Sequence, residues 1–473
     1  MDKKYMVNPY LPSWEYIPDG EPYVFDGRVY VYGSHDKFNG WAFCLNDYVC
    51  WSAPVDDLGN WRYEGVIYRK DQGPRNADRH ACLYAPDVTV GPDGRYYLYY
   101  VLDKEDVVSV AVCDTPAGKY EFYGHVHDKN GGLLGERPGD EPQFDPGLLT
   151  EGDVTYLYTG FCAANDTKRH GPMLTVLDKD MLTIIEEPVF IAPSAPYSKG
   201  SGYEGHEFFE APSMRKRGDT YYFVYSSIKS FELCYAVSDR PTGGFKYGGT
   251  IVANNDIGIS TYKPAQQPMA YGGNNHGSIV EIDGQWYIFY HRQTNGTHFS
   301  RQGCIEKIEF APDGSIPQAE ITSCCGVPLP GRGEYSAHLA CHLTAREEAG
   351  FVNGVHGWMD MRFPKITQDG KDGEECPAYV CNLADGASAG FKYFECKGVK
   401  AVSIKTRSYG NGCIAVKTSW DGEALCRIPV GYTNIWVKNT APVSIPDGVH
   451  ALYFTFEGEG ATSLLSFELH TEG

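Results

Sequence analysis

Four carboxylic acids and one histidine recur at related positions along this chain of 473 residues. Each of them stands six to eight residues before a turn that opens an aromatic-rich segment; they are Asp19, Asp87, Asp145, Glu210 and His276. Carboxyl groups that share a pocket cannot all ionise easily, so their pKa values separate and acid and base roles can be divided among them. Hydrolysis of a glycosidic bond needs such a pair. The pattern therefore predicts a convergent site for acid–base hydrolysis.

The turns that follow these residues predict the elements that position them. They begin at residues 26, 93, 152, 218 and 283, at intervals of 67, 59, 66 and 65 residues, and each is an Asp/Gly turn followed by β-branched and aromatic residues. This composition is typical of a β-hairpin, and a hairpin that recurs at a long regular interval is typical of a radial repeat. We predict a five-bladed β-propeller, in which equivalent residues meet at one end of the central channel.

The hairpin pattern ends in the segment 323–334, which contains the Pro- and Gly-rich run Val327-Pro-Leu-Pro-Gly-Arg-Gly333. Short alternating runs separated by Gly, Asn and Asp turns follow, which indicates a β-sandwich of the jelly-roll kind. The sequence thus predicts an all-β fold, with a propeller over residues 1–322, a linker over 323–334 and a β-sandwich over 335–473.

The bulk composition excludes several classes of partner. A formal charge of −20 argues against nucleic acid and anionic membranes, because both attract positive surfaces. No apolar run approaches the length of a membrane span, and no apolar signal region follows Met1. The fifteen cysteines are scattered, without metal-ligand spacing, which favours reduced, mostly buried thiols. We expect a cytoplasmic protein; a secreted form that has lost its signal peptide is the alternative.

Several other residues are candidates for contacts with a sugar. Tyr84 and Trp41 offer rings that stack on sugar faces, and Arg301 offers a guanidinium that binds a hydroxyl or shifts the pKa of a carboxyl group. A single Asp or Glu is more often a solvated surface group. Acids at equivalent places in a propeller can also cap strand ends or bind a structural ion, so these readings stand beside the catalytic one.

The ordered motifs resemble glycoside hydrolase family 43 over residues 8–320. The resemblance rests on Asn8-Pro-Tyr-Leu-Pro with Pro18-Asp19, Tyr84-Ala-Pro-Asp87, Phe144-Asp-Pro146, Glu210-Ala-Pro212, and His276-Gly277 with Tyr290-His291. Members of that family are inverting enzymes on a five-bladed propeller, mostly α-L-arabinofuranosidases, β-xylosidases and arabinanases. The resemblance implies Asp19 as the general base, Glu210 as the general acid, and Asp87 as the third carboxylate that tunes the acid. Because Gly-Glu-Pro follows Asp19, Glu21 is an alternative base.

The resemblance also implies a metal site and a binding module. His276 matches the histidine that often lies beside a calcium ion in the channel, and Arg301 matches an arginine of the sugar pocket. No organic cofactor is implied. Residues 335–473 resemble a family 6 carbohydrate-binding module, and the alternative is a sandwich that only packs against the propeller and shapes one side of the pocket.

The predicted function is inverting, exo-acting hydrolysis of oligosaccharides by an α-L-arabinofuranosidase, a β-xylosidase, or an enzyme with both activities. One alternative is a non-catalytic propeller that binds glycans. Others are enzymes of the same fold that act on galactose-type or fructose-type glycosides; the retaining fructosidases place their acid in a Glu-Cys-Pro context, whereas this chain has Glu210-Ala-Pro212.

Overall fold

The computed structural model of the chain describes residues 5–346 and 363–471. Its regular elements over these residues are β-strands and three short 3-10 helices, η1 (Pro74–Asn76), η2 (Ala195–Tyr197) and η3 (Ala337–Leu339). The predicted all-β class is therefore confirmed. Among the described residues there is no helix with the length and apolar character needed to cross a membrane.

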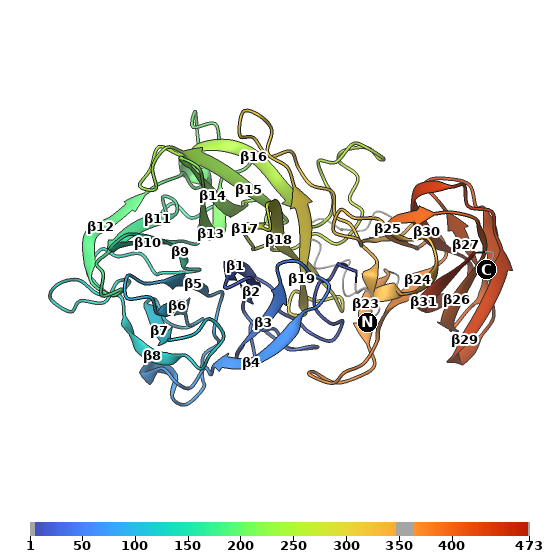
Figure 1. The fold of residues 1–473 in the computed structure, drawn as a ribbon, viewed down its shortest axis with the longest axis horizontal. Coiled ribbons are helices and arrows are strands. Elements are labelled where there is room, and N and C mark those ends of the chain that lie inside the picture. The colour runs from blue at the N-terminus through green and yellow to red at the C-terminus, as the bar shows by residue number, and fades with distance from the viewer. Residues whose placement is uncertain (1–4, 347–362, 472–473) are drawn as a thin grey trace.

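The first part of the chain forms five antiparallel sheets that surround a common centre (Figure 1). In each sheet the strands follow one another in sequence order, with the first strand innermost. Blade 1 contains β1 (Glu21–Phe25), β2 (Arg28–Tyr32), β3 (Tyr48–Pro54) and β4 (Arg62–Tyr68); blade 2 contains β5 (Asp87–Val90), β6 (Tyr96–Val101), β7 (Val108–Cys113) and β8 (Glu121–His125); blade 3 contains β9 (Gly147–Glu151), β10 (Val154–Thr159), β11 (Met173–Leu177) and β12 (Ile184–Phe190); blade 4 contains β13 (Phe208–Arg217), β14 (Thr220–Ser227), β15 (Glu232–Ser238) and β16 (Lys246–Ala253); blade 5 contains β17 (Ile279–Ile282), β18 (Gln285–Gln293) and β19 (Arg301–Ile308).

The five predicted turns connect the first two strands of each blade. The glycines of these turns, including Gly27 at φ 75° and Gly94 at φ 81°, adopt the left-handed conformation that glycine tolerates without a Cβ clash. Aromatic side chains of neighbouring blades pack between the sheets, as in the buried cluster that contains Tyr32, Tyr68 and Tyr100. The predicted five-bladed propeller is confirmed.

The ring closes where the N-terminal segment meets blade 5. The side-chain amide of Asn8 donates to the carbonyl oxygens of Ile305 and Thr322 at 2.9 Å each, and its own oxygen accepts from the Ile305 N–H at 2.8 Å. Gly20 and Gly277 form a parallel bridge between blades 1 and 5. These contacts join the first and last parts of the propeller into one closed structure.

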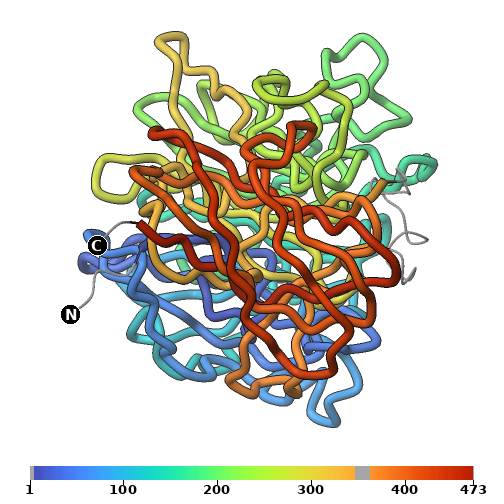
Figure 2. The backbone as a smooth tube through the Cα atoms, turned by 90° about the vertical axis from the view of Figure 1, so that its right-hand side faces the viewer, coloured from blue at the N-terminus to red at the C-terminus, as the bar shows by residue number. Residues whose placement is uncertain are grey.

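The second domain lies beside the propeller along the long axis (Figure 1), and the view along that axis places it in front (Figure 2). Two six-stranded sheets enclose its own hydrophobic core. One sheet contains β20 (Leu329–Pro330), β22 (His342–Thr344), β25 (Ser388–Cys396), β27 (Asn411–Lys417), β28 (Cys426–Val430) and β30 (Gly448–Glu459); the other contains β21 (Gly333–Ser336), β23 (Lys365–Gln368), β24 (Ala378–Ala384), β26 (Val399–Ser408), β29 (Thr433–Pro442) and β31 (Ala461–Thr471).

From Leu329 onward, the segment predicted as a linker is part of this second domain, whereas Cys325 still packs in the propeller core. β20 pairs with β25 in parallel, and Leu329 is buried in the core of the sandwich. Gly331 also donates its N–H to the carbonyl oxygen of Glu395 at 2.8 Å. A Pro- and Gly-rich stretch looks like a connection in sequence, but here it forms an edge strand, where a missing amide donor is tolerated.

Candidate active site

A cavity of about 370 Å³ opens at the centre of the propeller, and its volume falls in the usual range for small-molecule sites. It receives residues from all five blades or from the segments that lead into them. Its lining residues are Asp19, Phe43, Cys44, Tyr84, Ala85, Asp103, Phe144, Asp145, Phe161, Glu210, Asn274, His276 and Arg301. Four of the five predicted ring residues are thus brought together.

Backbone geometry directs three of these carboxyl groups into the cavity. Asp19 and Asp145 each stand two residues before the innermost strand of a blade and adopt φ values of 57° and 45°. A bulge in β13 begins at Glu210, and Ala211 has φ 63°. Non-glycine residues in this region cost about 1–3 kcal/mol each and gather at functional sites. Bulges likewise re-aim side chains beside active sites.

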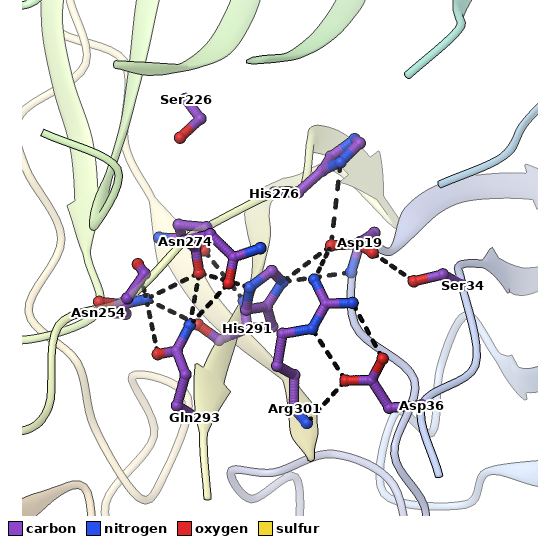
Figure 3. Close-up of polar contacts among 12 residues, drawn as sticks. Asp19, Ser34, Asp36, Ser226, Asn254, Asn274, His276, His291, Gln293 and Arg301 are labelled. Atoms are coloured by element: carbon purple, nitrogen blue, oxygen red, sulfur yellow. Dashed lines mark hydrogen bonds and ion pairs between the residues drawn. The ribbon is translucent and has the colours of Figure 1, made fainter. Parts of the chain in front are cut away.

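Asp19 is held by a set of polar groups (Figure 3). Its Oδ1 accepts from Arg301 Nη1 at 2.9 Å, and its Oδ2 accepts from the Ser34 hydroxyl. Burial by itself raises the pKa of Asp19, but the positive charge of Arg301, together with His291, His276 and the hydrogen bond from Ser34, outweighs burial and holds that pKa below its usual value. Asp19 is therefore an ionised carboxylate at neutral pH.

Two further residues fix the orientation of this carboxylate. Asp36 accepts hydrogen bonds from Arg301 Nε at 2.9 Å and Nη2 at 3.0 Å, so it clamps the guanidinium (Figure 3). The His291 ring lies 2.6 Å from the Asn274 carbonyl through Nε2 and 3.3 Å from the Asp19 N–H through Nδ1. Burial and the Arg301 charge lower the pKa of His291 to about 3, so its ring is neutral. Nε2 then donates to Asn274, and Nδ1 accepts from Asp19.

Glu210 has the opposite electrostatic environment. Burial raises its pKa to about 8, and the negative charge of Asp145 adds to the rise, against an opposing effect of His276. The pKa of Asp145 is also raised, to about 7, chiefly by burial and further by the negative charge of Asp19, against the opposing charge of His276. Glu210 therefore holds a proton at neutral pH while Asp19 does not. This division is what acid–base catalysis by two carboxyl groups requires.

Asp87 lies outside the cavity wall, contrary to the predicted ring. Its side chain is fully buried; Oδ1 accepts from the Tyr23 hydroxyl at 2.7 Å and Oδ2 from the Leu148 N–H at 2.7 Å. Tyr23 belongs to blade 1 and Leu148 to blade 3, so this carboxyl group of blade 2 ties three innermost strands together. Its position fits the strand-capping reading, and the ring carboxyl groups that line the cavity are Asp19, Asp145 and Glu210.

Of the remaining predicted residues, some line the cavity and others lie outside its wall. Tyr84 lines the cavity, where its ring meets that of Phe144 edge to face at 5.6 Å, and Arg301 lines it through the contact with Asp19. Trp41 does not line the cavity and is 81% exposed; Phe43, two residues later, lies in the wall instead. Glu21 is also outside the wall, because Arg215 Nη2 binds its Oε2 at 2.6 Å. Geometry thus favours Asp19 over Glu21 as the base.

His276 lies in the cavity wall, close to the ring carboxyl groups. Its Nδ1 is 3.7 Å from Asp145 Oδ2 and 4.0 Å from Asp19 Oδ1, and its Nε2 is 3.7 Å from Glu21 Oε1. That buried Glu21 oxygen has no hydrogen-bond partner among the described residues. An unpartnered carboxylate oxygen beside an imidazole suits a hard cation, which prefers oxygen ligands. The residues around His276 therefore fit the calcium ion that the sequence predicts.

Comparison with known proteins identifies the family. The model of glycosyl hydrolases family 43 matches residues 17–316. The chain belongs to glycosyl hydrolases family 43. A xylosidase/arabinosidase of Thermoclostridium stercorarium is 68% identical over 99% of this chain and 100% of its own length. The chain is thus similar to a relative of this family over the second domain as well as the propeller.

Solved structures of the family share the fold. An arabinoxylan arabinofuranohydrolase from Bacillus subtilis, solved in complex with cellotetraose, matches 99% of this chain and 99% of its own at 21% identity and a TM-score of 0.53. A β-xylosidase/α-arabinofuranosidase from a compost microbial metagenome, solved with xylotriose in a calcium-free form, matches 66% of this chain and 97% of its own at 26% identity and a TM-score of 0.52.

Proposed function

We propose that this family 43 chain is an inverting, exo-acting glycosidase that releases α-L-arabinofuranosyl units, β-xylosyl units, or both from oligosaccharides. The observation that carries the proposal is the opposite protonation of two carboxyl groups in one cavity, with the pKa of Asp19 lowered and that of Glu210 raised. The names of the relatives, xylosidase/arabinosidase at 68% identity and β-xylosidase/α-arabinofuranosidase at 26%, support the choice of sugars.

The geometry assigns a role to each group in the reaction. Glu210 donates its proton to the glycosidic oxygen as the bond between that oxygen and the anomeric carbon breaks. Asp19 accepts a proton from a water molecule whose oxygen bonds to the anomeric carbon from the opposite face. Asp145 keeps the proton on Glu210 until the leaving group needs it, since its negative charge opposes ionisation of Glu210. Arg301 keeps Asp19 ionised and ready to accept.

A panel of aryl glycosides tests the substrate class. We expect turnover of aryl β-D-xylosides and aryl α-L-arabinofuranosides, and little turnover of aryl galactosides or fructosides. A single pocket of this volume supports attack at a chain end, so short oligosaccharides should lose terminal sugars one at a time. Comparable turnover of an intact polymer, with internal cleavage products, would refute exo attack.

We also propose calcium as the ion of the channel, held near His276 and Glu21. When bound, such an ion would supply fixed positive charge beside the pocket and stabilise the neighbouring carboxylates. If prolonged chelation leaves the thermal midpoint unchanged and no ion co-purifies with the protein, this assignment is wrong.

For the second domain we propose glycan binding, as in a family 6 carbohydrate-binding module. Tyr409 and Tyr432 are 61% and 70% exposed, and their ring centroids lie 6.4 Å apart. Adjacent exposed aromatic rings supply stacking surfaces for sugars. Full-length Glu210→Gln should be retarded in a gel that contains soluble xylan, and replacing both tyrosines by alanine should abolish the retardation. Equal mobility of the two proteins would refute this role for the tyrosines.

We further propose that the protein acts in the cytoplasm, on imported oligosaccharides. All fifteen cysteines are unpaired, and most are buried, which supports a reducing compartment. Recovery of the enzyme with oxidised, paired cysteines from its native cells would contradict this location.

A further inference from the structure

Among the described residues of the second domain, the short segment 365–372 contacts a propeller loop that carries part of the pocket wall. It consists of β23 and the turn that follows, and Asp372 at its end contacts blade 1. Asp372 Oδ1 accepts from the Phe38 N–H at 2.6 Å, and Oδ2 accepts from Asn46 Nδ2 at 3.1 Å. Both hydrogen bonds are made by a side chain of one domain to a loop of the other.

That loop, residues 33–47, connects β2 to β3 without strand pairing of its own. Phe43 and Cys44 of this loop line the cavity, and the exposed Trp41 lies between them and Asn39 in sequence. Asn39 and Cys44 adopt φ values of 55° and 57°. Backbone hydrogen bonds from Asp36 and Asn46 hold the two ends of the loop, and because it pairs in no sheet and contains strained residues, its middle part depends on side-chain contacts to keep one conformation.

The base of the same loop continues into the catalytic network. Asp36 accepts from the Cys44 N–H at 3.0 Å and from Arg301, which in turn binds Asp19 at 2.9 Å. Asn46, the partner of Asp372, also donates to the Asp36 carbonyl oxygen at 3.0 Å. A continuous series of hydrogen bonds therefore runs from the second domain to the proposed base.

A second connection supports the opposite side of the loop. Asn295, between β18 and β19, donates its N–H to the Ile366 carbonyl at 2.7 Å, and its Oδ1 accepts from the Thr367 hydroxyl at 2.9 Å. Its Nδ2 then donates to Asn39 Oδ1 at 3.3 Å. The turn that contains Asn295 also carries Phe299, whose ring packs edge to face on Phe43 at 4.7 Å.

We propose that three residues of this segment, Ile366, Thr367 and Asp372, form a structural part of the active site, and that Asp372 is a positioning residue which fixes the pocket wall at Phe43 and Arg301. The inference rests on the proposed function, because the site that it describes is the glycosidase pocket. It assigns to the second domain a role in the propeller's own pocket that is separate from any glycan binding at its surface. A carboxylate is suited to this role, because it accepts from two donors at once and forms stronger hydrogen bonds than a neutral group.

The test compares full-length variants that differ at one position of this segment. Asp372→Ala removes both acceptors, and we expect KM for an aryl glycoside to rise by about tenfold with a smaller change in kcat. Asp372→Asn retains an acceptor for the Phe38 N–H and should recover part of the loss. Asp369→Ala is the matched control, since Asp369 binds Arg407 and Tyr379 within the second domain; its KM should equal that of the wild type.

Two additional measurements separate a positioning role from a general loss of stability, and one of them does not require a known substrate. Thr367→Val, nearly isosteric, removes the hydroxyl hydrogen bond to Asn295 and leaves the backbone bond between Asn295 and Ile366, so it should raise KM by a smaller factor while the thermal midpoint stays near the wild-type value. Hydrogen exchange of peptides that span residues 36–46 should accelerate in Asp372→Ala and remain unchanged in Asp369→Ala. Hydrogen exchange needs no substrate. If the wild-type protein hydrolyses no glycoside, the proposed function is refuted, and the exchange data still decide whether Asp372 positions the loop. Wild-type KM and wild-type exchange in Asp372→Ala would overturn the inference.

Discussion

Replacing Asp145 by asparagine should move the alkaline limb of the pH profile of kcat/KM toward lower pH. The proposed acid, Glu210, must be protonated to act, and its pKa is raised to about 8 by burial and by the charge of Asp145. Asparagine keeps the shape of the side chain and removes the charge. Burial still raises the pKa of Glu210, but the contribution of Asp145 is lost, so Glu210 ionises at lower pH and activity is lost earlier as the pH increases.

The size of this shift follows from the electrostatics of the pocket. Two unit charges about 4 Å apart interact by about 4 kcal/mol at an effective dielectric constant of about 20, and by less at larger separations. Such an energy corresponds to about 2–3 pKa units, because one unit equals about 1.4 kcal/mol. His276 lies 3.7 Å from Asp145 and compensates part of its charge. We therefore expect the limb to move by about 1–2 units.

The assay measures kcat/KM between pH 4 and pH 10 on an aryl glycoside with a poor leaving group, for which protonation limits the rate. Asp87→Asn is the matched control: Asp87 is buried among Tyr23 and Leu148 rather than in the pocket wall, so its variant should keep the wild-type alkaline limb. A shift in Asp87→Asn with no shift in Asp145→Asn would reverse the two assignments and refute the argument from pocket geometry.

Three further outcomes are expected. Glu210→Gln should lower turnover by about 10²–10⁴-fold on substrates with poor leaving groups and far less on those with very acidic ones, and equal losses on both would remove Glu210 from the acid role. Hydrolysis in added methanol should yield no methyl glycoside of retained configuration, because inversion forms no glycosyl-enzyme; its appearance, or a sugar trapped on Asp19, would make Asp19 a nucleophile. Because the pKa of Glu210 is higher in the folded than in the unfolded chain, its contribution to stability falls as pH rises from about 4.5 through 8, by about 1.4 kcal/mol for each pKa unit. The free energy of unfolding, measured by denaturation, should therefore be larger for Glu210→Gln than for the wild type at pH 9, and the difference should vanish near pH 4. A difference that stays constant with pH would contradict the raised pKa.

The fold could be predicted because each blade repeats a local signal. An Asp/Gly turn followed by aromatic and β-branched residues specifies a hairpin from its own residues, and five such hairpins have few ways to bury their rings other than around one axis. The predicted linker was wrong for a local reason. Prolines and glycines near Leu329 resemble a connection, and only the distant partner strand β25 makes the segment an edge strand.

The error at Asp87 has a signal in the sequence. Asp19, Asp145 and His276 stand seven residues before their turns, whereas Asp87 stands six residues before its turn. In a strand, a shift of one residue directs the side chain to the other face. Glu210 stands eight residues before its turn, and the bulge in β13 accounts for the extra residue. A strict count of the spacing sets Asp87 apart from the ring, but it also sets Glu210 apart, because the bulge in β13 is not visible in the sequence.

Other parts of the site depend on contacts that no local pattern shows. Ser34 and Asp36 follow directly after a strand of blade 1, and polar residues at strand ends often belong to sites, so they could have been found. His291 could not be assigned, because its role follows from its bonds to Asn274 and Asp19. The contact of Asp372 with Phe38 joins residues more than 300 positions apart and comes from the docking of two domains.

The hydrogen bonds of Asn8 have a consequence for biosynthesis. The partners of its side chain include Ile305, which lies 297 positions later in the chain. At a translation rate of about 5–20 residues per second, the ribosome needs about 15–60 s to make the chain between them. For most of that interval the first blade is complete in sequence while blade 5, which will close the ring against it, does not exist, and the apolar side chains that face blade 5, among them Tyr10 and Leu11, are open to water and to chaperones. The nascent propeller therefore stays an open arc until its last blade leaves the exit tunnel.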